Sequence, residues 1–523
     1  MNKFIYGFIF VFAVGSMWSC QKSGHDESKA KEEEQRKQMA KMGGLGMPRG
    51  LINKTVEATP GYVLFCPLLS ATTYLVNLDG EVVHTWESQY GPSGFSYLKE
   101  NGNLLRGGRD PQAPVFAGGG QGGRLQEITW EGELVWDYQF ASEQHLSHHD
   151  ATHMPNGNIL ALAWEAKTPE EARKAGLKPA LTPKAGVWPD IIVELQPEGK
   201  NNAKIIWEWH SWDHLIQDFD QSQNNFGVVT EHPELIDLNK KHPLPPPTTQ
   251  EAIDKLKASN QASTNSSIEN EGSDIFHTNA IAYNADLDQI VVSMPGLDEI
   301  LIIDHSTTIQ EASTHKGGRW GNGGDFLYRW GNPKNYNRGD TTNHMLGGQH
   351  DVKWIPKGYP GEGNIMVFDN SVPNQPKPYS AVLEITTPHS EKSYSLEAGK
   401  PFGPGEAIWK YLANDTTSFF SPFISGAHRM ANGNTFITEG VKGRYFEVTL
   451  AGKVVWEYWT PYAGFSRMPD GTFPQPVGPL IYATFRATHI MADHPSVKGK
   501  TLEPLSPQPE VYKVEKPSEG KKP

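Results

Sequence analysis

The chain has 523 residues, of which 37% are hydrophobic and 11% aromatic, and its formal net charge is −13. This acidic balance argues against a nucleic acid or an anionic membrane surface as the partner. The 52 glycines and 39 prolines indicate many turns, which favours an all-β fold of short strands over long helices.

The N-terminus predicts an exported lipoprotein. Lys3 is followed by the almost wholly apolar residues 4–14, a run that is too short to span a membrane and is typical of a signal peptide. Cys20 closes the signal over residues 1–20 and is expected to be lipidated, with a plain cleaved signal as the alternative. We therefore expect a protein of the cell envelope, at the outer membrane or facing the periplasm, that contacts the membrane only through its lipid. Cys66 is the only other cysteine, so no disulfide framework is expected.

Composition divides the rest of the chain. Residues 21–55 are charged and then rich in Gly and Met, with no apolar face, and they predict a flexible tether. Residues 56–496 are expected to form one folded domain with an insertion at about 211–272, which is rich in Pro, Ser, Asn and Gln. Residues 497–523 are charged and rich in Pro and are predicted to be disordered.

Two short patterns repeat along the folded domain. One is a turn followed by an apolar strand that closes with an aromatic residue, and its six copies contain Trp86, Trp136, Trp207, Trp330, Trp409 and Trp456. The other is an Asn-Gly turn before an apolar strand, found at 101–105, 156–160, 363–367 and 432–436, with a degenerate copy at 287–291. Each unit therefore predicts a four-stranded antiparallel blade, and about six blades make a β-propeller. The first unit lacks an inner strand, which residues 481–490 could return to supply.

A histidine recurs at one position of the predicted inner strands. Each predicted inner strand has an apolar residue just before its turn. The position five residues before that apolar residue is a histidine in three units, namely His149, His277 and His350, and a serine in two others, namely Ser425 and Ser93. Because the innermost strands of a propeller line its central channel, these positions are predicted to form a ring.

Strand alternation predicts which way the neighbours of these histidines face. His148 is predicted to face away from His149, whereas His153 shares the face of His149 and could support it. Asn279 follows His277 by two residues and could donate to the same ligand. The histidines of the predicted loops, among them His214 and His315, are assigned no role.

Three imidazoles allow two kinds of chemistry. They could hold a zinc ion with an open position for water, as in a metal-dependent hydrolase. Alternatively, one neutral imidazole could attack a substrate while the others stabilise an anion, with no metal. No Cys-rich or HExxH motif favours a metal, so neither a metal nor another cofactor is predicted. A non-catalytic propeller that binds a partner or glycan at the cell surface is the third interpretation.

Six motifs resemble those of the bacterial arylsulfotransferases, also called aryl-sulfate sulfotransferases. They are residues 148–150, 274–281, 348–352, 367–370, 425–429 and 443–448, and together they span most of the chain from about 60 to 490. The resemblance implies an exported six-bladed propeller that transfers a sulfuryl group from a phenolic sulfate ester to a phenolic acceptor without a nucleotide sulfate donor.

The resemblance also suggests roles for individual residues. His350 matches the histidine that becomes transiently sulfated, and His149 and His277 match those that hold the sulfuryl oxygens, with Asn279 beside them. Candidate substrate-binding residues are Asn279, His153, Ser425 and Arg444.

One position departs from the family pattern. An arginine is expected at the end of the strand after His277, where this chain has Pro295. Loss of a guanidinium removes a bidentate sulfate ligand. Arg329, Arg444 or Arg319 could substitute from another loop, which leaves the source of the missing charge open.

Overall fold

The computed structural model describes residues 43–240, 249–258, 263–390, 393–463, 481–500 and 502–511. The predicted signal peptide, most of the predicted tether and Cys20 lie outside these residues. No helix among the described residues is both long and apolar enough to cross a membrane.

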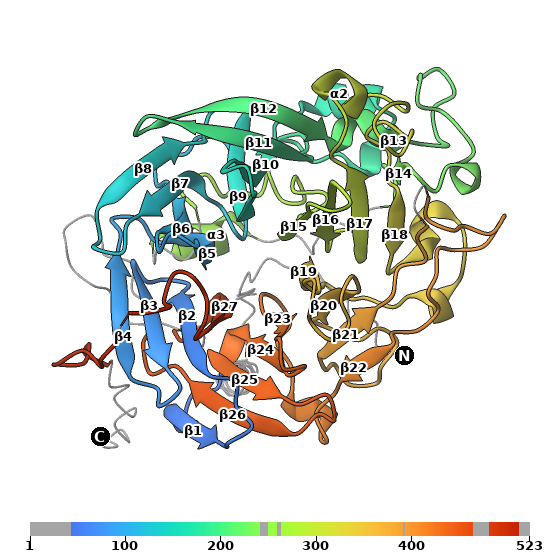
Figure 1. Ribbon diagram of the computed structural model, residues 1–523. Coiled ribbons are helices and arrows are strands. Elements are labelled where there is room, and N and C mark those ends of the chain that lie inside the picture. The colour runs from blue at the N-terminus through green and yellow to red at the C-terminus, as the bar shows by residue number, and fades with distance from the viewer. Residues whose placement is uncertain are drawn as a thin grey trace, which may run out of the picture.

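The protein is all-β, with antiparallel sheets arranged around a centre in the manner of a propeller (Figure 1). The first sheet has the order β27-β2-β3-β4 and contains β2 (Gly61–Pro67), β3 (Thr72–Asn77), β4 (Val82–Glu87) and β27 (Thr484–Met491). Antiparallel pairing of β27 with β2 confirms that residues from the C-terminal part supply the inner strand of the first unit.

The next eight strands form one sheet with the order β12-β11-β10-β9-β5-β6-β7-β8. They are β5 (Pro92–Leu98), β6 (Leu104–Arg109), β7 (Gly123–Ile128), β8 (Leu134–Gln139), β9 (His145–His153), β10 (Ile159–Glu165), β11 (Asp190–Glu198) and β12 (Asn202–His210). A single parallel pair, Gly94 with His149, joins β5 to β9. The predicted four-stranded blades are therefore not all separate sheets, because the inner strands of two units approach closely enough to pair.

Three sheets complete the ring. Two have four strands each: β15 (Ala280–Asn284), β16 (Gln289–Met294), β17 (Glu299–Asp304) and β18 (Tyr328–Trp330), then β19 (His350–Trp354), β20 (Ile365–Asp369), β21 (Ala381–Ile385) and β22 (Trp409–Tyr411). The third has five: β23 (Gly426–Arg429), β24 (Thr435–Glu439), β25 (Arg444–Val448), β26 (Val454–Trp459) and β1 (Gly50–Lys54).

Short elements occupy the connections. They are α2 (Pro169–Lys174), α3 (Gln250–Ala258), α4 (Ile309–Ala312), the parallel pair β13 (Leu215–Ile216) and β14 (Ile236–Asp237), and the 3-10 turns η1 (Pro179–Leu181), η2 (Ser211–His214), η3 (Val229–Glu231), η4 (Pro333–Tyr336), η5 (Thr341–Asn343), η6 (Thr416–Ser418) and η7 (Gly440–Lys442). The predicted insertion at 211–272 thus contains η2, β13, η3, β14 and α3 among its described residues.

Two predicted boundaries differ from the structure. Residues Gly50–Lys54 belong to the predicted tether, yet they form β1 and pair with β26. Residues 502–511 belong to the tail that was predicted to be disordered, yet the Leu505 N–H donates to the carbonyl of Val82 at 2.8 Å. In both places the edge of a sheet offers unpaired backbone groups, which a segment can satisfy without burying an apolar face of its own.

The recurring tryptophans link each unit to the next. Each indole N–H donates to an oxygen in the following unit, in the pairs Trp86–Thr129, Trp136–Asn202, Trp207–Thr307, Trp330–Pro404, Trp409–Leu450 and Trp456–Leu78. The last pair returns to the turn between β3 and β4. The tryptophans therefore repeat because a large apolar side chain with one donor can pack between sheets and bond across their boundary.

The Asn-Gly turns repeat for a similar local reason. In four units an Asn side chain of the turn donates to a Glu of the third strand, in the pairs Asn103–Glu127, Asn158–Glu194, Asn364–Glu384 and Asn434–Glu447. This bond fixes where the inner hairpin ends, and hence which residues of the inner strand reach the channel.

Candidate active site

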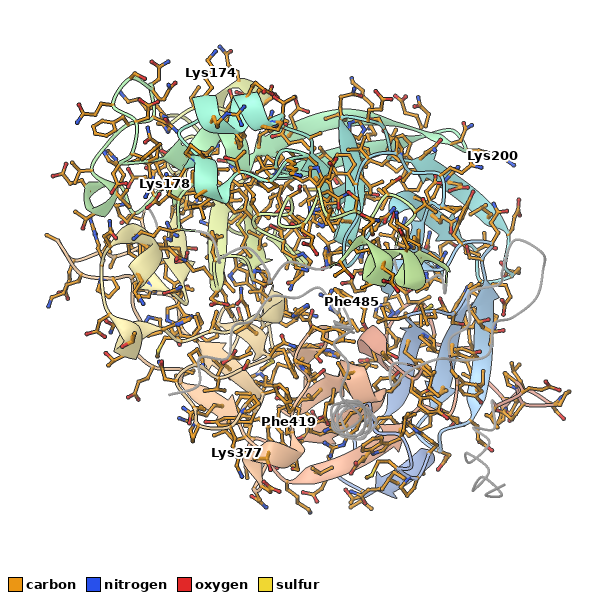
Figure 2. The ribbon with its side chains drawn as sticks, turned by 180° about the vertical axis from the view of Figure 1, so that it is seen from behind. Lys174, Lys178, Lys200, Lys377, Phe419 and Phe485 are labelled. Atoms are coloured by element: carbon orange, nitrogen blue, oxygen red, sulfur yellow. The ribbon has the colours of Figure 1, made fainter. Side chains whose placement is uncertain are left out.

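The structure brings the three recurring histidines to one place. His149 lies on β9, His277 precedes β15, and His350 is the first residue of β19. The ring centroids of His149 and His277 are 4.5 Å apart, with the planes nearly perpendicular. Phe485 of β27 lies near the middle of the ring (Figure 2), and its centroid is 6.0 Å from those of both His149 and His350. Inner strands of four different units therefore meet here.

The backbone at these positions is unusual. His149, His277 and Asp351 have φ angles of 51°, 56° and 57°, in the left-handed region that non-glycine residues rarely adopt. Strand pairing is also irregular beside His149 and His350. Each such residue costs about 1–3 kcal/mol and persists only where its surroundings hold it. This backbone geometry is a local distortion that directs the side chain.

His148 contradicts the prediction from strand alternation. Its Nδ1 atom lies 2.9 Å from Nδ1 of His149, so the two neighbours meet rather than facing apart. The reason is the left-handed residue at His149, which interrupts the two-residue period of the strand. The buried His148 ring stacks on Trp164 at 4.3 Å, and its Nε2 lies 3.1 Å from a carboxylate oxygen of Asp190.

The pKa of His149 lies well below its usual value. Burial is the main cause, and the neighbouring His277, His148 and His350 add to it. His149 is therefore a neutral imidazole near pH 7. Its ring can donate one hydrogen bond and accept another, but it carries no charge.

His277 has the opposite electrostatic environment. Its Nδ1 bonds to Oδ2 of Asp274, while Oδ1 of Asp274 accepts the indole N–H of Trp164 at 3.1 Å. Burial lowers the pKa of His277, but the charge and hydrogen bond of Asp274 more than offset this, and the pKa is raised. Of the three recurring histidines, His277 is thus the one best able to carry a positive charge.

The environment of His350 selects one neutral tautomer. Its Nδ1 lies 2.8 Å from Oδ1 of Asn370 and 2.9 Å from the carbonyl of Gly348, both acceptors, so Nδ1 carries the proton. The Asn370 amide is oriented by its Nδ2 group, which donates to the carbonyls of Ser421 and Ile424. Burial, followed by the charge of His277, lowers the pKa of His350 to about 3. The Nε2 atom therefore keeps a lone pair, which accepts the Ile424 N–H at 3.1 Å.

A buried arginine joins the strands that carry these histidines. Nη1 of Arg486 donates to Asp150 at 2.9 Å, and its Nε lies 2.8 Å from Asp351. Asp150 also accepts the Ile281 N–H, and Asp351 accepts the Ala427 N–H. One guanidinium and two carboxylates thereby connect β9, β15, β19, β23 and β27. Burial raises the pKa of Asp351, but the charges of Arg486 and then Lys353 lower it by more. The pKa is therefore lowered overall, and this carboxyl is ionised.

A glycine loop covers two of the imidazoles. The carbonyl of Gly120 accepts the His149 N–H at 2.8 Å, and a Cβ atom at Gly120 would lie 2.2 Å from the His149 ring. A Cβ at Gly119 would contact His277 at 3.6 Å. A side chain at Gly120 would therefore collide with the site, which explains a glycine there.

Two further predicted residues support the site indirectly. Asn279 donates through Nδ2 to the carbonyl of Gln349, the residue before His350, at 2.9 Å. The Ser425 hydroxyl bonds to the Ser421 hydroxyl at 2.8 Å and accepts the Gly440 N–H. Both side chains hold backbone segments that flank His350.

His153 and Arg444 lie elsewhere. His153 is exposed at the far end of β9, where its nearest charged neighbours include Lys99 and Glu100. Arg444 is engaged by two carboxylates, Glu439 and Glu457. Within the described part of the chain, neither contacts the three imidazoles.

The remaining substitutes for the missing arginine are also placed elsewhere. Arg329 is buried against Glu299 and Arg319 reaches the carbonyl of Asp286. Pro295 lies in a tight turn in which the Leu297 N–H donates to Met294 at 3.0 Å.

Several residues of the site were not identified from the sequence. Asp274 and Asn370 lie within motifs 274–281 and 367–370, so their position beside a recurring histidine was an available signal. Arg486 had no such signal, because it lies 336 residues from Asp150 in the chain.

Arg486→Met should destabilise the fold strongly, because it leaves Asp150 and Asp351 buried without a cation. We expect a loss of about 3–5 kcal/mol in the free energy of unfolding, measured by urea denaturation. The matched control is Arg173→Met, which removes an exposed pair with Glu170 and should cost less than about 1 kcal/mol. Equal losses in the two variants would contradict the role assigned to Arg486.

No curated protein matches this chain. Among solved structures, a protein of unknown function from Bacteroides caccae is 11% identical, with 83% of this chain and 99% of that chain covered and a TM-score of 0.40. Virginiamycin B lyase from Staphylococcus aureus is also 11% identical, with 78% and 87% covered and a TM-score of 0.33.

The family model for arylsulfotransferase (ASST) matches residues 70–458, which is most of the chain. This range includes His149, His277 and His350 but ends before Arg486. The chain belongs to the arylsulfotransferase (ASST) family.

Proposed function

We propose that this protein transfers a sulfuryl group from a phenolic sulfate ester to a phenolic acceptor through a sulfated His350. Family membership supports arylsulfotransferase activity in general. The observation that carries the specific proposal is the fixed tautomer of His350, with its proton on Nδ1 and a lone pair on Nε2. A neutral imidazole of this kind is a nucleophile at neutral pH.

The first half-reaction forms one bond and breaks another. Nε2 of His350 attacks sulfur, the bond from sulfur to the aryl oxygen breaks, and the phenol leaves with a proton from Nε2 of His277. Asp274 keeps the proton on Nδ1 of His277 and favours its cationic form before the transfer. Neutral His149 can donate a hydrogen bond to a sulfuryl oxygen, and the cation at His277 offsets charge on the sulfuryl oxygens.

The second half-reaction regenerates the site. The oxygen of an acceptor phenol attacks sulfur, its proton returns to His277, and the bond between sulfur and His350 breaks. Both half-reactions use one intermediate, so ping-pong kinetics are expected.

Donor binding must displace one contact. The Nε2 lone pair of His350 accepts the Ile424 N–H in the structure, so it cannot attack sulfur until this hydrogen bond lengthens. Ile424 and Ser425 both have positive φ angles, 51° and 90°. Once displaced, the Ile424 amide is a free donor beside the sulfuryl group.

Arg109 is our candidate for the guanidinium missing at Pro295. Within the described residues it is the one arginine with no hydrogen bond, ion pair or ring contact from its side chain, although it is half-buried. Its backbone pairs with Gly123, in the segment that continues from the glycines over His149 and His277. Burial lowers the pKa of Arg109, but an arginine side chain in a protein stays protonated. A guanidinium without a partner favours binding of a sulfate group.

The number of blades and the location of the protein complete the proposal. We count the eight-stranded sheet as two blades, giving six, because one parallel pair alone joins its halves and six tryptophans bond between successive units. We also propose that the protein is exported and anchored in the cell envelope through Cys20.

His350→Ala should abolish sulfuryl transfer from p-nitrophenyl sulfate to phenol, with a loss of at least ~10³-fold in kcat. Mass spectrometry of the wild type quenched without acceptor should find one SO₃ group on the peptide that contains His350. The comparison variant is His153→Ala, which should keep near-wild-type activity because His153 is far along the strand. Turnover in His350→Ala equal to that of the wild type would refute the proposal. Loss of wild-type activity in a chelator, under conditions in which the protein stays folded, would favour a metal-dependent hydrolase.

Activity should fall as the pH rises through the raised pKa of His277, because the protonated form is the active one. Lowering the pH should not protonate His350 until close to its pKa of about 3. Asp274→Asn removes the main cause that raises the pKa of His277, so burial dominates and the alkaline limb should move to lower pH. The pH profile of kcat/KM checks this, with the exposed Asp286→Asn as the control. An unchanged alkaline limb in Asp274→Asn would contradict the role of His277.

Arg109→Ala should lower kcat/KM by about 10- to 100-fold, corresponding to the loss of charge-assisted hydrogen bonds to sulfate. Arg109→Lys should retain part of the activity, since it keeps the charge but not the bidentate geometry. Steady-state kinetics with the aryl sulfate donor measures both. Wild-type kinetics in Arg109→Ala would show that another group binds the sulfate.

A further inference from the structure

A second cluster of histidines lies on the outer part of the ring. His214 ends η2, after β12, while His315 and Asp325 belong to the connection between β17 and β18. Nδ1 of His214 lies 2.8 Å from Oδ1 of Asp325, and Nδ1 of His315 lies 2.9 Å from the same oxygen. The three possible ligand atoms all lie within 4.8 Å of one another. Two imidazole nitrogens from separate segments therefore point at one carboxylate.

The hydrogen bonds of His214 require a proton or another cation beside its Nδ1 atom. Its Nε2 lies 2.9 Å from the carbonyl of Ala312, which can only accept, so Nε2 carries a proton. In the neutral ring Nδ1 then has a lone pair, which faces an oxygen of the Asp325 carboxylate, a group that also only accepts. Two such groups at 2.8 Å repel unless a cation lies between them. The cation is either a second proton on a fully buried imidazole or a metal ion.

The surroundings of His214 match those of a metal ligand. A histidine that binds a metal through one nitrogen usually donates its other N–H to a carbonyl or carboxylate, as His214 does to Ala312. Trp209 stacks parallel to the ring at 5.4 Å and donates to the carbonyl of Gly324 at 2.7 Å. A Cβ at Gly324 would lie 2.6 Å from Nε2 of His214. The ring is thus held on its face and at its edge, with Nδ1 directed at Asp325.

We propose that His214, His315 and Asp325 bind a divalent transition metal, with zinc as the best match. Two imidazoles and a carboxylate are ordinary zinc ligands, and three protein ligands leave a fourth position for water. His315 is 59% exposed, so this position opens to solvent. Zinc–ligand bonds of about 2.0–2.1 Å place tetrahedral ligands roughly 3.4 Å apart, so the side chains must separate by about half an ångström on binding.

The proposed metal is separate from the sulfuryl-transfer chemistry. Among the described residues, none of the three cluster residues contacts His149, His277 or His350. Its effect would be to fasten the segment after β12 to the connection between β17 and β18. Binding would therefore stabilise the fold and leave the nucleophile at His350 independent of metal.

The test is a titration of the tag-free full chain, stripped with chelator, with Zn²⁺ by calorimetry and with Co²⁺ by visible absorption. One equivalent of each should bind, with a tetrahedral Co²⁺ spectrum, and Zn²⁺ should raise the melting temperature. His315→Ala should weaken binding by at least about 100-fold and remove the shift in melting temperature. Because His315 is exposed, this variant is expected to fold.

The matched control is His232→Ala, which removes a nearby, partly exposed histidine paired with Glu234. It should bind both metals as the wild type does. Absence of stoichiometric binding in the wild type would overturn the proposal and favour a buried imidazolium. Undiminished binding in His315→Ala would also overturn it, because the metal would then be held by other residues.

Discussion

The ion pairs of Arg486 are the interaction on which the site depends. Asp150 and Asp351 each follow a recurring histidine directly, and both are buried against the one guanidinium. The side chains of all three are at most 3% exposed, so water cannot replace a lost partner. Arg486 lies on β27, the last strand among the described residues, whose pairing with β2 also closes the ring. The strand that closes the propeller therefore also carries the arginine that aligns the histidines.

The same ion pairs limit how strongly the positive charge of Arg486 can attract an anionic substrate. Two carboxylates offset the positive charge of Arg486, so it contributes little net attraction to an anion. Three chemically identical side chains then differ only through their neighbours. The neutral acceptors around His350 leave it an uncharged nucleophile, whereas the carboxylate of Asp274 favours a cation at His277. The division of roles that we propose follows from these neighbours rather than from the imidazoles themselves.

The sequence predicted the features that arise from local periodicity. The Trp and Asn-Gly patterns identified the strands and turns, and the register of the inner strands selected His149, His277 and His350. It failed for His148, because strand alternation does not hold across a left-handed residue. It could not identify Arg486, because no local pattern indicates that a residue near the C-terminus will meet two aspartates from distant strands. The expectation of separate four-stranded blades failed where the backbone of Gly94 comes close enough to pair with His149.

The strained backbone indicates which part of the site can move. The left-handed residues His149 and Asp351 are held on several sides, since the Gly120 carbonyl accepts the His149 N–H and Arg486 fixes Asp351. Their strain is offset by these contacts, so the histidines are positioned before a substrate arrives. The N–H of Ile424 is held differently, because it bonds only to the atom that is expected to attack sulfur, whereas the Ile424 carbonyl accepts from Asn370. A donor that displaces this amide exchanges one hydrogen bond for another, and the rest of the site can remain in place. The peptide N–H of Ile424 is therefore where the conformational change on donor binding should be concentrated, while the Ile424 carbonyl and the Ser425 hydroxyl keep their bonds to Asn370 and Ser421.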